Sequence, residues 1–235
     1  MSLIFKNPIF CAIDTPDPAK AYKMASRLKG SVGGLKLGLE FYMANGPAGY
    51  REIAKLDMPI FLDAKLHDIP NTLYGAVSSL LPLKPAYITM YASGGPAMMR
   101  AAADAAAKAG PDRPKLLGVT VLTSLDTNDL AATGQDTNVA EQVLRLARLA
   151  QSSGLDGVAC SPVEIAMLRK ACGPDFVLMV PGIRPEWAAA NDQKRTMTPR
   201  EAVQAGATHL VIGRPITGAS DPLEAAKRIA AEIVA

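Results

Sequence analysis

The stretch IFLDAKL at residues 60–66 begins as an apolar strand and ends in opposite charges. Its continuous apolar start is typical of a strand that is buried on both faces of a parallel sheet. Seven more short apolar runs share this character. They lie at residues 9–14, 33–38, 87–92, 115–122, 156–160, 176–183 and 209–216.

The segments between these runs carry the start signals of helices. Asp17 followed by Pro18 predicts an N-cap and a first helical residue. The sequences SPVE (161–164) and TPRE (198–201) have the spacing of a capping box, in which a hydroxyl and a carboxylate satisfy free backbone N–H groups. We therefore expect helices to begin at these positions.

Eight strands that alternate with helices in 235 residues predict an α/β fold, a single (β/α)8 TIM barrel that spans residues 1–235 as one domain. The hydrophobic fraction of 49% supplies the apolar side chains for a core of that size. The alternative is a doubly wound open sheet. Against it, no G-x-G-x-x-G follows the first run and no linker divides the chain.

Charge and composition argue against several classes of protein. The formal net charge is +3 and the lysines and arginines are scattered, so we expect no nucleic-acid partner, whereas a small anionic ligand fits. Neither a signal peptide nor an apolar run of the length that spans a membrane is evident, and we expect a cytoplasmic protein without a membrane partner.

Cysteine and histidine are sparse. Cys11, Cys160 and Cys172 form no C-x-x-C pair and are expected to be reduced thiols. The two histidines, His67 and His209, lie far apart in the sequence, so we expect no metal site built on histidine.

Charged residues gather where the first three runs end. Asp14 ends the first run, Lys36 lies late in the second, Asp63 and Lys65 lie two apart in the third, and Asp68 follows. The carboxyl ends of barrel strands share one mouth, so we expect these side chains to converge there as a network of paired charges. The structural alternative is that Asp68 caps the next helix and that the others form surface ion pairs.

A second signal ends the seventh and eighth runs, in PGIR (181–184) and GRPIT (213–217). Glycines there let backbone amides approach an anion, and Arg184 or Arg214 adds a charged fork, which together predict a phosphate site. The alternative interpretation is two glycine turns with surface arginines.

Residues 182–196 lack clear periodicity over a length that exceeds a usual barrel connection, which favours a lid in which Gln193 closes on the ligand. The alternative is a short irregular helix around Trp187.

At the end of the fifth run, VTVLTS (119–124) brings Thr120, Thr123 and Ser124 to the mouth. A hydroxyl there can form a hydrogen bond with the edge of a planar ring. The alternative is that these are ordinary strand residues, since threonine is common in strands.

These residues together resemble a known family, the orotidine 5′-monophosphate decarboxylases. DAKLHDIPNT (63–72) fits the family pattern D-x-K-x-x-D-I. The motifs AID, KLG, VTVLTS, PGIRP, DQKR and GRPIT support the match and occur along the chain in the expected order. The likeness extends from Asp14 to Thr217. It implies a cofactor-independent, homodimeric barrel that converts orotidine 5′-monophosphate (OMP) to uridine 5′-monophosphate (UMP) and carbon dioxide, the last step of de novo UMP synthesis.

The resemblance also implies roles for single residues. Lys65, Asp63, Asp68 and Lys36 would be the catalytic set, with Asp63 and Lys65 facing the reacting carbon and Asp14 and Lys36 on the ribose hydroxyls. Asp68 and Thr72 would complete the neighbouring subunit's site. Thr123 would bind the pyrimidine. The phosphate would be bound by Gln193, Arg214, Arg184 and the backbone near Pro181 and Gly213.

Loss of carbon dioxide from the pyrimidine leaves a poorly delocalised carbanion, which the Lys65 ammonium can stabilise and then protonate. Two rival functions remain from sequence. One is a magnesium-dependent decarboxylase of a sugar phosphate with the same D-x-K-x-x-D frame, against which Lys36 argues because a cation beside Asp14 and Asp63 would meet its ammonium. The other is a barrel that binds a nucleotide without turnover.

Overall fold

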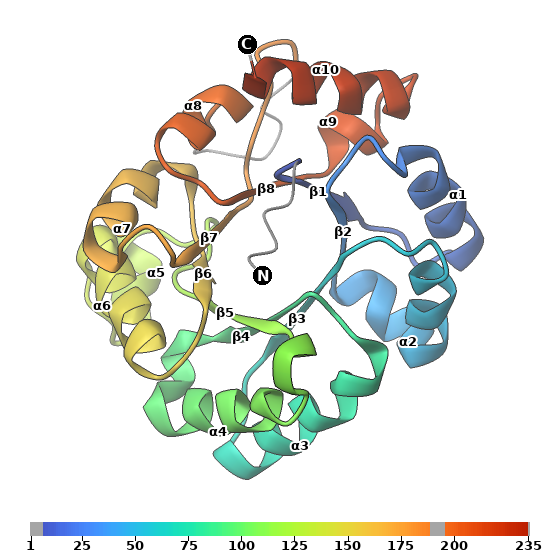
Figure 1. The fold of residues 1–235 in the computed structure, drawn as a ribbon. Coiled ribbons are helices and arrows are strands. Elements are labelled where there is room, and N and C mark those ends of the chain that lie inside the picture. Colours follow the sequence, from blue (N-terminus) through green and yellow to red (C-terminus); the bar gives the residue numbers. More distant parts are fainter. Residues whose placement is uncertain (1–6, 189–195, 235) are drawn as a thin grey trace.

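The computed structural model describes residues 7–188 and 196–234, and its eight strands close into a parallel barrel in sequence order. Figure 1 looks into this barrel, with the helices in a ring outside the strands. The strands are β1 Ile9–Ile13, β2 Gly34–Leu37, β3 Ile60–Leu66, β4 Tyr87–Tyr91, β5 Lys115–Val119, β6 Gly157–Ala159, β7 Val177–Val180 and β8 His209–Ile212. The predicted (β/α)8 TIM barrel is confirmed, and the open sheet is excluded because β8 pairs with β1.

The α-helices that follow the strands are α1 Pro18–Leu28, α2 Leu39–Ala54, α3 Pro70–Leu80, α4 Gly95–Ala107, α5 Thr127–Ala132, α6 Val139–Ser152, α7 Ile165–Cys172, α8 Pro199–Gln204, α9 Arg214–Thr217 and α10 Pro222–Val234. Short 3₁₀ turns occur at Leu81–Leu83, Ala92–Gly94, Gly110–Asp112 and Pro162–Glu164. Within the described part of the chain, no helix is long and apolar enough to cross a membrane.

The predicted helix starts are largely as expected. The Asp17 carboxylate accepts the backbone N–H groups of Ala19 and Lys20 ahead of α1. Capping boxes form at both predicted sites, although the one at Ser161 opens a 3₁₀ turn before α7. Asp68 does not cap α3: the N-cap of that helix is Ile69, and Asp68 only accepts the Ile69 backbone N–H. The capping alternative for Asp68 is therefore wrong.

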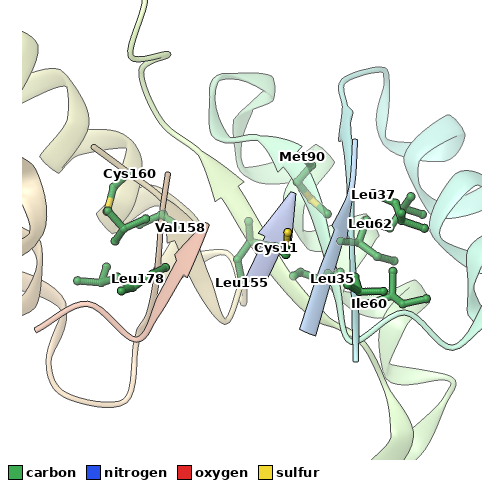
Figure 2. Close-up of a cluster of buried hydrophobic side chains, with 14 of the residues drawn as sticks. Cys11, Leu35, Leu37, Ile60, Leu62, Met90, Leu155, Val158, Cys160 and Leu178 are labelled. Carbon is green, nitrogen blue, oxygen red and sulfur yellow. The ribbon is translucent and has the colours of Figure 1, made fainter. Parts of the chain in front are cut away.

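Two cores with different positions follow from the alternation of side chains along the strands. Inside the barrel lies a cluster that includes Phe10, Phe61, Tyr87 and Leu117. The intervening residues, such as Cys11, Leu35 and Leu62 (Figure 2), belong to a larger cluster. This cluster also contains the buried helix residues. All three cysteines are buried and free.

Candidate active site

A cavity of about 320 Å³ lies at the carboxyl ends of the strands, a size within the range of small-molecule sites. Its walls are mixed, with apolar residues such as Phe61 and Met179 beside charged ones. Nine of the residues predicted for the site line it: Asp14, Lys36, Asp63, Lys65, Thr123, Pro181, Arg184, Gly213 and Arg214. The structure thus brings together signals from both ends of the sequence.

Four of the charged side chains that line the cavity form a line of alternating sign. The Lys36 Nζ atom lies 3.1 Å from an Asp14 carboxylate oxygen and 3.8 Å from Oδ2 of Asp63. The Lys65 Nζ atom lies 2.7 Å from the same Oδ2. Asp63 is only 9% exposed, so this carboxylate is held almost entirely by protein groups, and each ammonium has a carboxylate neighbour as expected.

The strand positions explain why these side chains meet. Ala12 of β1 and Phe61 of β3 face the barrel interior. Asp14 lies two residues beyond Ala12, and Asp63 and Lys65 lie two and four residues beyond Phe61. Side chains two residues apart point to the same face. The inward faces therefore change from apolar in the middle of the barrel to charged at the mouth.

Strand β3 departs from regular geometry at this point. Leu62 pairs with Ile88 and Leu66 pairs with Met90, so three residues of β3 oppose the single residue Thr89 of β4. Lys65, the last of the three, has a φ of 47°, which is unusual for a residue with a side chain. Bulges of this kind commonly re-aim a side chain next to an active site.

Thr89 is a residue of the site that sequence reasoning missed. It is fully buried, its hydroxyl donates to Oδ1 of Asp63 at 2.8 Å, and it accepts the Lys65 backbone N–H at 3.0 Å. The one available signal was a threonine in a run of aromatic and aliphatic residues at 87–92, two residues after Tyr87 and therefore on the same inner face.

Neighbouring groups respond to the charged network. Burial, with a smaller effect of the Asp63 charge, raises the pKa of Tyr91 at the end of β4. Burial and the Asp14 charge raise the pKa of Cys11 to about 12, against the opposing effect of Lys36. The Cys11 thiol is therefore neutral at physiological pH and unsuited to act as a nucleophile.

The opposite wall carries the predicted phosphate groups. Gly182 has a φ of 80°, a conformation that glycine adopts at little cost, and it lines the cavity after β7. Arg184 is only 8% exposed and donates from Nη1 to the Ile183 carbonyl at 2.9 Å. Arg214 begins α9 directly after β8. The alternative of two surface arginines is wrong for Arg184, which is buried at the cavity wall.

Three predicted residues are not among those that line the cavity. Asp68 and Thr72 are exposed, one before and one within the first turn of α3. Gln193 lies outside the described residues. Of the predicted hydroxyls after β5, Thr123 lines the cavity, whereas Thr120 is buried and donates to the Ala159 carbonyl at 3.4 Å.

The segment predicted as a lid is described only at its two ends. Ile183 bridges Met197, and the Arg184 backbone N–H donates to the Met197 carbonyl, so the ends are joined beside the cavity. Trp187 lies in a turn, not in a helix, and packs on Arg228 of α10 with the guanidinium 4.8 Å from the ring centre. The irregular helix proposed around Trp187 is therefore absent from residues 182–188.

No group of three histidine, cysteine, aspartate or glutamate side chains is placed to hold a metal ion within residues 7–188 and 196–234. The cavity instead combines two ammonium groups, two carboxylates and two guanidinium groups with apolar lining residues. Such a site can bind an anion on one wall and stabilise negative charge that develops near the other.

Comparison with known proteins agrees with this geometry. The model of the orotidine 5′-phosphate decarboxylase / HUMPS family matches residues 7–229. Orotidine 5′-phosphate decarboxylase from Paramagnetospirillum magneticum is 55% identical over 231 residues, which cover 97% of this chain and 98% of the relative. The enzyme of that name from Rhodospirillum rubrum is 52% identical over 239 residues, with 100% and 97% covered.

A solved structure shows the same architecture. The crystal structure of orotidine 5′-phosphate decarboxylase from Lactobacillus acidophilus superimposes with a TM-score of 0.85 at 37% identity, covering 98% of this chain and 100% of the other. The closed barrel, the charged mouth and these matches lead to one conclusion: the chain belongs to the orotidine 5′-phosphate decarboxylase / HUMPS family.

Proposed function

We propose that this protein is a cytoplasmic orotidine 5′-phosphate decarboxylase, one barrel domain that converts OMP to UMP and carbon dioxide in the last step of UMP synthesis. Near full-length relatives of that name support the proposal. The observation that carries it is the contact of 2.7 Å between Lys65 Nζ and Asp63 Oδ2 at the cavity floor, with Lys36 on the other side of the same carboxylate. A fixed ammonium in this position is what a pyrimidine carbanion requires.

The chemical step uses protein side chains and a proton from solvent. The bond between the ring carbon and the carboxylate breaks, carbon dioxide leaves, and the electron pair stays on the carbon. Lys65 stabilises this charge through its ammonium, then transfers a proton to the carbon and regains one from solvent. Asp63 adds repulsion toward the substrate carboxylate, a ground-state effect that ranks below transition-state stabilisation.

The other residues hold the nucleotide. Asp14 and Lys36, which are joined at 3.1 Å, bind the ribose hydroxyls, and Thr123 binds the pyrimidine. Arg214, Arg184, Gln193 and the backbone near Pro181 and Gly213 bind the phosphate. Enzymes lower barriers by about 8 to 23 kcal/mol, more than one ammonium supplies, so binding energy from the phosphate must contribute by holding the charged network against the ring.

The working form is proposed to be a homodimer in which Asp68 and Thr72 enter the neighbouring subunit's site. Both side chains are exposed at the mouth. Three large apolar side chains are exposed in the same part of the barrel, after β2 and β3: Leu39 at 41%, Met43 at 74% and Ile69 at 65%. In the proposed homodimer these side chains would be covered by the neighbouring subunit.

The donor set does not suit a divalent cation. A cation between Asp14 and Asp63 would lie against the Lys36 ammonium, which already contacts both carboxylates. The proposed reaction therefore uses no metal ion between these carboxylates.

The test is OMP turnover by protein that has been treated with a chelator. The reaction is measured by the loss of the substrate's ultraviolet absorbance and by the release of carbon dioxide. We expect turnover that added magnesium does not change. Tight UMP binding without product would instead indicate a nucleotide-binding barrel. Turnover of a sugar phosphate only with magnesium would indicate the rival decarboxylase.

A further inference from the structure

The β3 bulge is held by one side chain from the neighbouring strand. Asp63, Ala64 and Lys65 face Thr89 alone, so this part of β3 has no regular ladder with β4. The Thr89 hydroxyl takes the place of a backbone acceptor for the Lys65 N–H, at 3.0 Å. A buried N–H without such a partner would cost free energy, and the left-handed backbone of Lys65 adds further cost.

The same hydroxyl fixes the orientation of a carboxylate. An ionised carboxylate only accepts hydrogen bonds, so the Thr89 proton must point at Oδ1 of Asp63, 2.8 Å away. This contact leaves Oδ2 turned toward Lys65 at 2.7 Å and Lys36 at 3.8 Å. One hydroxyl thus sets both the backbone from which Lys65 extends and the carboxylate that Lys65 meets.

We propose that Thr89 is a positioning residue for the decarboxylation, acting through Asp63 and Lys65, an inference that rests on the proposed function of the site. Thr89 is fully buried beneath these two residues and does not line the cavity. Its effect is therefore on the geometry of the reacting groups and not on nucleotide binding. Valine has the same shape as threonine, but it can make neither of the two hydrogen bonds of this buried hydroxyl.

The experiment compares Thr89→Val, which keeps the shape, with Thr89→Ser, which keeps the hydroxyl. A misplacement of about 1 Å costs about 100-fold in rate, so we expect Thr89→Val to lose about that factor in kcat. The affinity of Thr89→Val for UMP should stay within about threefold, because the phosphate and ribose contacts are intact. Thr89→Ser should recover most of the rate, because it keeps the hydroxyl.

Thr208→Val is the matched control. The Thr208 hydroxyl likewise accepts a backbone N–H from a neighbouring strand, that of Leu178 at 3.0 Å, but it lies before β8 at the opposite end of the barrel. We expect a similar loss in thermal stability with unchanged kcat. Should Thr89→Val not fold, Thr89→Ala is measured instead with the same expectation.

Two failures are distinguishable. Wild-type turnover of OMP together with a Thr89→Val rate within threefold of it would overturn the role of Thr89 alone. A rate loss in Thr89→Val that Thr89→Ser does not recover would also overturn it, because the hydroxyl would not be the cause. Wild-type protein without OMP turnover would instead overturn the proposed function.

Discussion

Asp63 is the residue on which the site depends most. One of its oxygens accepts from Thr89 and the other meets Lys65, with Lys36 beyond. Sequence spacing was sufficient to place Asp63 and Lys65 on one face, because side chains in a strand alternate. Spacing did not reveal the left-handed backbone of Lys65 or its support by Thr89, because both depend on how β3 and β4 pair.

Gly38 controls the position of Lys36 by lacking a side chain. A Cβ at this position would lie 2.9 Å from Lys36 Nζ and 3.3 Å from an Asp14 oxygen. The φ of Gly38 is −91°, which any residue can adopt, so the constraint is steric. We predict that Gly38→Ala displaces the Lys36 ammonium and lowers kcat/KM for OMP by about 10- to 100-fold.

The same substitution should change the free energy of unfolding by less than about 1 kcal/mol, because the atom that must move is the end of a flexible side chain. Urea denaturation measures this. Unchanged kcat/KM in Gly38→Ala would show that the Lys36–Asp14 contact does not matter for turnover.

His209 should make stability depend on pH. It is 4% exposed inside the barrel, where its Nε2 lies 2.7 Å from the Tyr87 hydroxyl oxygen. Burial, with the nearby Lys115 charge, lowers the pKa of His209 to about 4 from its ordinary 6.5. As pH falls from 6.5 to 4, the unfolded chain takes up a proton that the folded protein does not, so stability falls, by up to about 3 kcal/mol.

We predict that His209→Gln reduces this loss between pH 6.5 and 4 in urea denaturation at a fixed protein concentration. His67→Gln replaces the other, exposed histidine and is the matched control, with the wild-type slope expected. An equal slope in His209→Gln and wild type would contradict the assignment to His209.

At the scale of elements, the barrel was predictable because each strand and helix leaves a local signal. The apolar runs locate all eight strands, but several predicted runs extend past the strand end. Residues 209–216 read as one run, yet β8 ends at Ile212, and Ile216 is buried as part of the short helix α9. An apolar run indicates that its residues are buried, and residues just after a strand can be as buried as those within it. The end of a run therefore does not locate the end of a strand.

Arg169 joins two connections at the amino-terminal end of the barrel. Its guanidinium donates to three carbonyls before β7, those of Gly173, Pro174 and Phe176. It also donates to the Gly206 carbonyl and the Thr208 hydroxyl before β8. No lysine can span these acceptors, because an ammonium lacks the planar fork. We predict that Arg169→Lys lowers the free energy of unfolding by about 2 to 4 kcal/mol.

Arg145→Lys is the control, since Arg145 forms a surface pair with Asp136 at 2.9 Å and its side chain is 61% exposed. It should cost less than about 1 kcal/mol. Because Arg169 lies at the end of the barrel that carries stability and not catalysis, kcat of Arg169→Lys should match wild type at low temperature. Equal stability of the two variants would refute the bridging role.

At the scale of the whole molecule, a single chain brings most of the predicted site residues to one cavity, while two of them lie exposed outside it. Asp68 and Thr72 follow β3 but do not line the cavity of their own chain. The position of Asp68 after the third run predicted that it would join the charges at the mouth, but the part of Asp68 and Thr72 in a neighbouring subunit's site came only from the family resemblance. A contact between two copies leaves no periodicity in one sequence. Their role therefore rests on the proposed dimer.

A mixture of variants tests the shared site. In a hybrid of Lys65→Ala and Asp68→Ala chains, one of the two sites combines an intact Lys65 with an intact Asp68. Random pairing makes half of the dimers hybrids, so the mixture should regain about a quarter of wild-type activity.

Lys65→Ala mixed with Asp63→Ala is the control. Both residues belong to the same chain's part of the site, so its hybrids should regain nothing. No recovery in the first mixture, with exchange of subunits proven by mass spectrometry, would argue against a site shared between chains.

The most direct measurement is the rate of carbon dioxide release from OMP by Lys65→Ala beside wild type, with UMP affinity measured on both. We predict a loss of at least about 1,000-fold in rate with UMP affinity within about threefold, because the ammonium acts on the transition state. Lys55→Ala, at an exposed helix end paired with Glu52, should behave as wild type. Turnover by Lys65→Ala within about tenfold of wild type would contradict the central claim that this ammonium drives the decarboxylation.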